Sequence, residues 1–260
     1  MRTYRTILYA VQDGVATLTL NRPERRNAIG SEMANELLWA LEDAFADPLA
    51  RSVVLTGAGK AFCAGGDFLQ MSGGDAGAEP LPPKGGYDDL LRVLWRAPKP
   101  VVAKVNGHAL GGGLGIAAAC TFAVASTEAK LGTPEIEVGL FPFMILAILG
   151  RHVPRRRLLE LMLGGEKLSA EEAARIGLVN RAVAPAELDD EVKRWTDRIA
   201  SKSASTIRLG LRALADAEEL ALDEQLPMLA GRLAECLGTD DAREGLMAFL
   251  EKRPARWTGS

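Results

Sequence analysis

The stretch of sequence that decides the fold is a glycine-rich turn between two apolar segments. The turn reads Gly107-His108-Ala109-Leu110-Gly111-Gly112-Gly113-Leu114-Gly115-Ile116. The apolar run Val101–Val105 precedes it, and small residues follow it through Cys120. This order predicts a strand, a turn and a helix. The first N–H groups of such a helix are unpaired and carry partial positive charge, so the turn favours a phosphate or an oxyanion.

Two further segments upstream and downstream of this turn carry related signals. Residues 57–67 form a second glycine turn, and they follow the β-like run Ser52–Thr56. The two turns could each present one N–H group to a single oxygen. Residues 131–142 place an acidic residue, Glu135, beside a very apolar stretch. Oxyanion donors and a desolvated carboxylate are the groups needed to move a proton next to a carbonyl.

Bulk properties exclude several classes of protein. The 260 residues suffice for one large domain, or one domain with a small appendage, and the net charge of −3 does not suggest a nucleic-acid surface. The apolar run 140–149 is too short to span a bilayer, which takes about 20 residues. Three cysteines without metal-ligand spacing and only two histidines argue against a disulfide framework and a metal site. We therefore expect a cytoplasmic protein with no metal, membrane or nucleic-acid partner.

The order of elements predicts a mixed α/β fold with a helical C-terminal region. Strands are expected at 15–20 and 52–56, separated by a helix that Ser31 caps and whose inner face carries Met33, Leu37, Leu41 and Phe45. Helices are expected over 186–200, 204–217 and 220–237, after a capping box formed by Ser169 and Glu172. We place a boundary near residue 200, with a core and active site in 1–200 and an oligomerisation region in 201–260.

Residues 72–86 are dense in glycine and proline and predict a loop. It is either a surface insertion or a flap near the ligand, and the sequence leaves both interpretations open.

The chain as a whole resembles the enoyl-CoA hydratase/isomerase family, also called the crotonase family. The resemblance is carried by six groups of residues in fixed order: Asn21-Arg22-Pro23 with Asn27-Ala28; the Gly57–Asp67 turn; the Asn106–Gly113 turn; Pro134-Glu135 with Gly139-Leu140; Leu168-Ser169-Ala170 with Ala173–Val179; and Gly245–Arg253. Each group is weak alone, but their order and spacing together form a strong signal.

This resemblance implies a spiral of repeated ββα units and C-terminal helices that pack a trimer or a dimer of trimers. It also implies an acyl-CoA thioester substrate of the kind met in fatty acid metabolism, and no cofactor, because CoA is part of the substrate. The family's oxyanion N–H groups correspond to Gly66 and Gly112. Glu135 corresponds to one of the two glutamates that the family's hydratases use as acid and base.

The resemblance also suggests contacts for the substrate and its CoA portion. Arg25 and Lys60 are candidates for the phosphates, and Lys252 matches a lysine that reaches CoA on a neighbouring subunit. Ala64, Phe68 and Phe141, with Gly66 and Gly112, complete the predicted substrate contacts. Each basic residue also has a simpler interpretation as surface charge.

Two departures from the family pattern bear on the reaction. The second hydratase glutamate should stand at position 115, where this chain has Gly115. Moving a double bond needs one base that removes and returns a proton, so a single glutamate suits isomerisation better than hydration. The segment 141–146 is bulky and apolar, as in some enoyl-CoA isomerases. Glu137 would point the same way as Glu135 in an extended segment, but it has no family match.

Three alternatives stay open. The run Gly113–Ala118 fits a dinucleotide-binding fingerprint, with Glu135 about 20 residues on, although Asn106 and His108 in the preceding loop are foreign to it. Other thioester chemistry of the same fold, such as hydrolysis, dehalogenation or decarboxylation, is compatible with Gly115. The third alternative is a CoA-ester-binding protein without catalysis.

Overall fold

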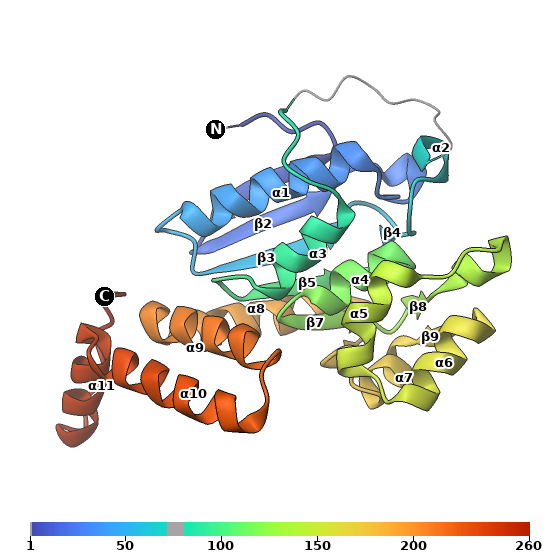
Figure 1. The fold of residues 1–260 in the computed structure, drawn as a ribbon. Coiled ribbons are helices and arrows are strands. Elements are labelled where there is room, and N and C mark those ends of the chain that lie inside the picture. The colour runs from blue at the N-terminus through green and yellow to red at the C-terminus, as the bar shows by residue number, and fades with distance from the viewer. Residues whose placement is uncertain (1, 72–80) are drawn as a thin grey trace.

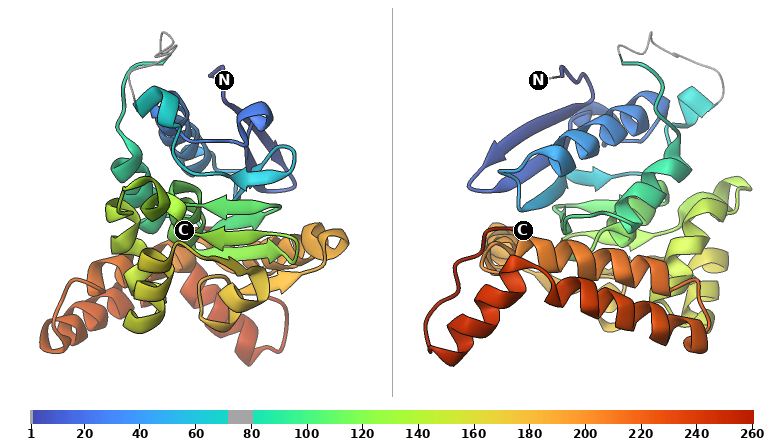
Figure 2. Two further views of the ribbon diagram at one scale, coloured as in Figure 1. Left: turned by 90° about the vertical axis from the view of Figure 1, so that its right-hand side faces the viewer. Right: turned by 60° about the vertical axis from the view of Figure 1, so that its left-hand side comes forward.

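The computed structural model describes residues 2–71 and 81–260 and contains two sheets (Figures 1 and 2). The larger sheet has the strand order β1-β2-β3-β5-β7-β10, in which every neighbouring pair is parallel except β1 and β2. Its strands are β1 (Ile7–Gln12), β2 (Val15–Leu20), β3 (Ser52–Gly57), β5 (Val101–Val105), β7 (Phe122–Ser126) and β10 (Arg181–Val183). The strands predicted at 15–20 and 52–56 are therefore confirmed.

The smaller sheet has the order β4-β6-β8-β9, with only β8 and β9 antiparallel. Its strands are β4 (Ala61–Cys63), β6 (His108–Leu110), β8 (Lys130–Gly132) and β9 (Lys167–Ser169). The consecutive pairs β3–β4, β5–β6 and β7–β8 each place one strand in each sheet, and helical segments follow each pair. This repetition confirms the expected ββα architecture.

Eleven α-helices and three short 3₁₀ helices lie in the described residues. They are α1 (Ser31–Ala46), α2 (Phe68–Met71), α3 (Tyr87–Trp95), α4 (Gly112–Ala119), α5 (Phe143–His152), α6 (Arg155–Gly164), α7 (Ala170–Arg175), α8 (Leu188–Ala200), α9 (Ala204–Ala217), α10 (Leu222–Leu237) and α11 (Asp240–Leu250), with η1 (Pro23–Arg25), η2 (Pro134–Val138) and η3 (Pro185–Glu187). No helix in this part of the chain is long and apolar enough to cross a membrane. The cytoplasmic location stays a prediction.

The larger sheet is covered on both faces. Its central strands are accordingly apolar at successive positions. Val53 and Leu55 of β3 belong to the main core cluster, to which α1, α3 and α4 contribute, whereas Val54 belongs to a second cluster with Leu188 and Val192 of α8. Alternate residues of one strand therefore face different layers, as the period of two requires.

The C-terminal helices α9, α10 and α11 extend away from the two sheets (Figure 1). Helix α10 buries none of its side chains within the chain. The predicted helices 204–217 and 220–237 match α9 and α10 closely, and Ser169 and Glu172 form the expected capping box, with hydrogen bonds of 2.8 and 3.1 Å. The division at residue 200 stays a prediction.

One local expectation needs correction. Ser31 is the first residue of α1, and Gly30 occupies the N-cap position without a side-chain hydrogen bond. The inner face of α1 is as expected, with Met33, Leu37 and Leu41 buried. Of the predicted loop 72–86, residues 81–86 lack regular structure. Residues 72–80, on which the two interpretations of the loop depend, lie outside the described part.

Candidate active site

The two glycine turns come together because the strands before them pair. β4 and β6 are parallel neighbours, so their carboxyl ends meet at the same edge of the smaller sheet. β4 leads into Gly65 and Gly66, and β6 leads into Gly111 and Gly112. The backbone at Gly65 has φ of 109° and that at Gly111 has φ of 50°, which non-glycine residues rarely adopt.

Each turn offers an unpaired backbone donor. The neighbours of Gly66 are fixed by a parallel bridge to Ile29, in which Ile29 N–H donates to Gly65 and Asp67 N–H donates to Ile29, both at 2.8 Å. The N–H of Gly66 and that of Gly112, the first residue of α4, have no hydrogen-bond partner within residues 2–71 and 81–260. They are available to a ligand oxygen.

Glu135 supplies the carboxylate of the site. It lies in η2, and its Oε2 is buried without a hydrogen-bond partner in the described structure. Burial raises the pKa of Glu135 above its ordinary value, because desolvation penalises the charged form. This is the direction required of a group that takes and returns a proton near neutral pH.

A cavity of about 430 Å³ joins these groups. Of the residues named from the sequence, Gly66, Gly112, Glu135 and Phe141 line it. Most of the remaining wall is apolar and comes from the start of α1 and the start of α5; it includes Ile29, Ala34, Leu140, Phe143, Met144 and Ile145. Phe143 and Met144 are 74% and 52% exposed, so this wall is open to solvent on its outer side.

The other predicted contacts lie outside the lining of this cavity. Arg25 makes an ion pair of 3.2 Å with Asp67, which Arg22 also contacts at 3.1 Å. Burial alone would raise the pKa of Asp67, but the hydrogen bond from Arg25 and the charge of Arg22 lower it. Lys60 is exposed in the first turn, and the N–H of Ala64 donates to the carbonyl of Arg26.

Two predicted contacts need separate comment. Phe68 begins α2, but its side chain is outside what the structure describes. Lys252 is exposed and follows just after α11, a helix that lies far from β4 and α4 (Figure 1). Lys252 does not line the cavity of its own chain.

Tyr87 is the polar cavity residue that the sequence analysis missed. It begins α3, and its hydroxyl donates a hydrogen bond of 2.5 Å to the carbonyl of Gly112. A β-carbon at Gly115 would stand 2.5 Å from this hydroxyl and would overlap Ile145. The space beside Gly115 is thus filled by two side chains from elsewhere. Tyr87 follows Gly85 and Gly86, which belong to none of the motifs, so only its packing reveals it.

Glu137 is not a second carboxylate of this cavity. The segment 134–138 is a 3₁₀ helix rather than an extended strand, so residues two apart do not share a face. Glu137 is exposed and does not line the cavity, and the expectation that it points the same way as Glu135 is wrong.

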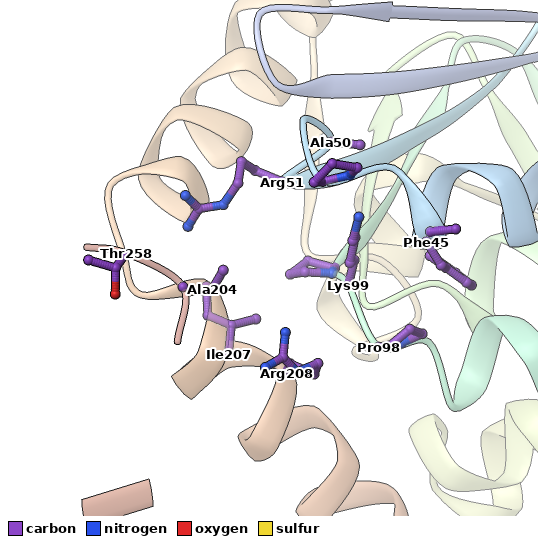
Figure 3. Close-up of a pocket in the computed structure, with 13 residues that line it drawn as sticks. Phe45, Ala50, Arg51, Pro98, Lys99, Ala204, Ile207, Arg208 and Thr258 are labelled. Carbon is purple, nitrogen blue, oxygen red and sulfur yellow. The ribbon is translucent and has the colours of Figure 1, made fainter. Parts of the chain in front are cut away.

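A second cavity, of about 370 Å³, lies at the opposite ends of the strands, where β3 and β5 begin (Figure 3). Arg51, Lys99 and Arg208 line it, and the described lining contains no acidic side chain. Lys99 donates to the carbonyls of Ala44 and Asp47, at 3.0 and 2.6 Å, and so caps the end of α1. Lys99 is engaged at the end of α1, whereas the cavity beside Glu135 combines a buried carboxylate with two unpaired backbone donors, so the latter is the candidate active site.

Comparisons with known proteins identify the family of the chain. The sequence model of the enoyl-CoA hydratase/isomerase family matches residues 10–260. A protein of Thermus thermophilus named among the enoyl-CoA hydratases is 40% identical over 251 residues, covering 94% of this chain and 97% of the relative. The crotonyl-CoA hydratase of Syntrophomonas wolfei is 36% identical over 262 residues, covering 98% of each chain.

A solved structure extends the likeness to three dimensions. The enoyl-CoA hydratase of Mycobacterium smegmatis superposes with a TM-score of 0.90 at 35% identity, covering 97% of this chain and 99% of that one. The fold, the length of the match and the degree of identity agree, and the chain belongs to the enzymatic enoyl-CoA hydratase/isomerase family.

Proposed function

We propose that this enzyme moves the double bond of an enoyl-CoA thioester through an enolate, with Glu135 as its only carboxylate acid and base. The observation that carries the proposal is that Glu135 and two unpaired N–H groups, from Gly66 and Gly112, border one largely apolar cavity. The thioester carbonyl oxygen would accept hydrogen bonds from both N–H groups. An oxygen that gains charge in the transition state is stabilised most by such fixed donors.

In this mechanism Glu135 removes a proton from C2 of a 3-enoyl thioester and returns it to C4. The electron pair passes into the thioester carbonyl and back, and the double bond moves from C3–C4 to C2–C3. The raised pKa of Glu135 eases the return of the proton. Phe141 and Ile145 line the space for the acyl chain. The step uses no cofactor other than the CoA that the substrate carries.

For the CoA portion we retain Arg25 and Lys60 as phosphate contacts, and Ala64 and Phe68 as neighbours of the thioester end. We further propose that the enzyme is a trimer or a dimer of trimers, in which Lys252 reaches the CoA of another subunit. Lys252 follows just after α11, which lies away from the two sheets, and this placement supports a contact between subunits (Figure 1).

Hydration is the second candidate reaction, and the name of the crotonyl-CoA hydratase relative favours it. The absence of a carboxylate at Gly115 argues for isomerisation instead. Hydrolase, dehalogenase or decarboxylase chemistry on the same enolate, and CoA-ester binding without catalysis, are the remaining alternatives.

Matched short- and medium-chain 2-enoyl-CoA and 3-enoyl-CoA esters decide between these reactions, with products identified by mass spectrometry and nuclear magnetic resonance. We expect isomerisation to outpace hydration. Hydration faster by about tenfold or more would make the enzyme a hydratase, and binding of CoA esters without any turnover would overturn the catalytic proposal.

A further inference from the structure

Tyr87 shares a cavity with Glu135. Both residues line it, and the hydroxyl is held in place by its 2.5 Å hydrogen bond to the carbonyl of Gly112. The pKa of Tyr87 is raised well above its ordinary value, chiefly by burial and in addition by the nearby Cys63 and Glu135. The phenol therefore keeps its proton at neutral pH.

The position of this hydroxyl coincides with the place of a missing side chain. A β-carbon at Gly115 would stand 2.5 Å from the Tyr87 oxygen. Position 115 is where the family's second hydratase glutamate would begin. The phenol thus fills part of the space that a carboxylate from α4 would enter, and it brings a polar oxygen to that space from α3.

A phenol oxygen has one hydrogen to donate and lone pairs that accept. The hydrogen of Tyr87 is directed at the carbonyl of Gly112, so toward any other group the phenol oxygen can only accept a hydrogen bond. A water molecule can satisfy two acceptors at once, since it carries two hydrogens. Among the described lining residues, Glu135 and Tyr87 supply two such acceptors, the carboxylate and the phenol oxygen.

We propose that Tyr87 positions the reacting water, by accepting one of its hydrogen bonds, in the role that a second carboxylate would otherwise fill. The inference rests on the proposed function, since Glu135 must act on the same thioester. In the step, the water oxygen bonds to C3, the C2–C3 π bond breaks and its electron pair passes into the thioester carbonyl. Glu135 takes one water proton and then delivers it to C2, while the proton of Tyr87 does not move.

The role of Tyr87 separates hydration from isomerisation, because only hydration uses a water molecule. We expect Tyr87→Phe to lower the ratio of hydration to isomerisation by about tenfold, the effect of losing one ordinary hydrogen bond. The pH dependence of the residual hydration should be unchanged, because Glu135 alone transfers the proton. Tyr4→Phe is the matched control: its hydroxyl donates to Asp43, 2.8 Å away on α1, and it does not line the cavity.

Loss of both reactions by the same factor in Tyr87→Phe would show that the hydroxyl acts only by fixing Gly112, and would overturn the water-positioning role. An unchanged ratio, or a wild-type enzyme that isomerises but does not hydrate, would overturn it as well. A wild-type enzyme with neither reaction contradicts the proposed function itself, which is a distinct result.

A second variant protects the test against misfolding of Tyr87→Phe. Site-specific 3-fluorotyrosine at position 87 keeps the shape of the side chain and weakens the oxygen as an acceptor. We expect a smaller fall in the same ratio, with unchanged binding of CoA esters. Equal hydration in the fluorinated and unmodified enzymes would contradict the proposal.

Discussion

The carboxylate of Glu135 packs directly against the backbone of Gly111. A β-carbon at Gly111 would lie 2.8 Å from Cδ of Glu135 and still nearer to one of its oxygens. Gly111 therefore serves two purposes: its φ of 50° forms the turn, and its missing side chain leaves room for the acid beside the start of α4. The distance between the turn before α4 and the carboxylate of Glu135 therefore depends on Gly111, which has no side chain of its own.

Glu135→Gln should abolish most of the activity while preserving substrate binding. The amide keeps the shape of the side chain but cannot take a proton, and general acid–base groups typically contribute at least about 10²-fold. We expect kcat to fall by that factor, measured on the better of the two substrate classes, with little change in binding of a CoA ester. Glu137→Gln is the control and should retain activity, since Glu137 is exposed outside the cavity. Near-normal turnover of Glu135→Gln would remove Glu135 from the mechanism.

In the pH profile of activity, the fall on the acid side should occur at a higher pH than an exposed glutamate would give. Because burial raises the pKa of Glu135, its carboxylate is protonated, and so unable to act as base, at higher pH than an exposed glutamate near 4.3. Activity should therefore decline on acidification at a pH clearly above that value, with binding unaffected. The same shift means that ionised Glu135 opposes folding above its unfolded-state pKa, so Glu135→Gln should not lower the melting temperature. An acid limb at the ordinary pKa of glutamate would contradict the burial argument.

Gly115→Ala should destabilise the protein rather than assist catalysis. Its β-carbon would overlap Ile145 and stand 2.5 Å from the Tyr87 oxygen, so the packing of α4 against α3 and α5 must shift. Overpacking of this kind typically costs about 1–3 kcal/mol. We expect a lower urea midpoint, and for Gly115→Glu no gain in hydration. Gly210→Ala in α9 is the control; a β-carbon there meets nothing within 4 Å, so stability should be unchanged or slightly higher. Faster hydration by a folded Gly115→Glu enzyme would show that the space is adaptable.

Asp241 should hold the C-terminal tail in a pH-dependent way. Its side chain is 1% exposed and accepts hydrogen bonds from Ser203, Ser205, Thr258 and Gly259. Burial alone would raise the pKa of Asp241, but these hydrogen bonds outweigh it and lower the pKa to about 2. A lowered folded-state pKa means that the stabilisation is present above the unfolded value near 4 and is lost as the pH falls toward 2.

We therefore expect Asp241→Asn to lower the free energy of unfolding by about 1–3 kcal/mol at neutral pH, since buried donors lose their acceptor. The difference from wild type should shrink below about pH 4. Asp240→Asn is the control, because Asp240 makes only an exposed pair with Arg243 at 2.7 Å. If Asp241→Asn lowers the free energy of unfolding equally at pH 7 and pH 3, the charge of Asp241 is not the stabilising feature.

The apolar face of α10 should mediate assembly. Its exposed leucines recur at spacings of three and four residues and so form one stripe: Leu222, Leu226, Leu229, Leu233 and Leu237. We expect light scattering to give a trimer or a multiple of it, and Leu233→Lys to shift the population toward smaller species. Leu163→Lys, which changes an exposed leucine on α6, should leave the molecular mass of the assembly unchanged. An active wild-type monomer would contradict the assembly.

Local patterns in the sequence predicted much of the architecture, because those patterns act over short range. Alternating and continuous apolar runs identified β2, β3 and β5, and the glycine turns predicted where backbone donors would be exposed. The capping box at Ser169 was also readable, since both partners lie within four residues. Glu137 was misplaced because an extended backbone was assumed where Pro134 begins a 3₁₀ helix.

What the sequence by itself determined is the strand-turn-helix units, which depend on residues close together in the chain, and the family, which depends on the order of short motifs; it also predicted Glu135 as the carboxylate. What only the tertiary structure decided is the content of the space beside Gly115. Tyr87 and Ile145 reach it from α3 and α5, which are 28 and 30 residues away from Gly115 along the chain. No local pattern encodes such a contact, because it arises only when the helices pack around α4 and excluded volume determines which side chain occupies the gap.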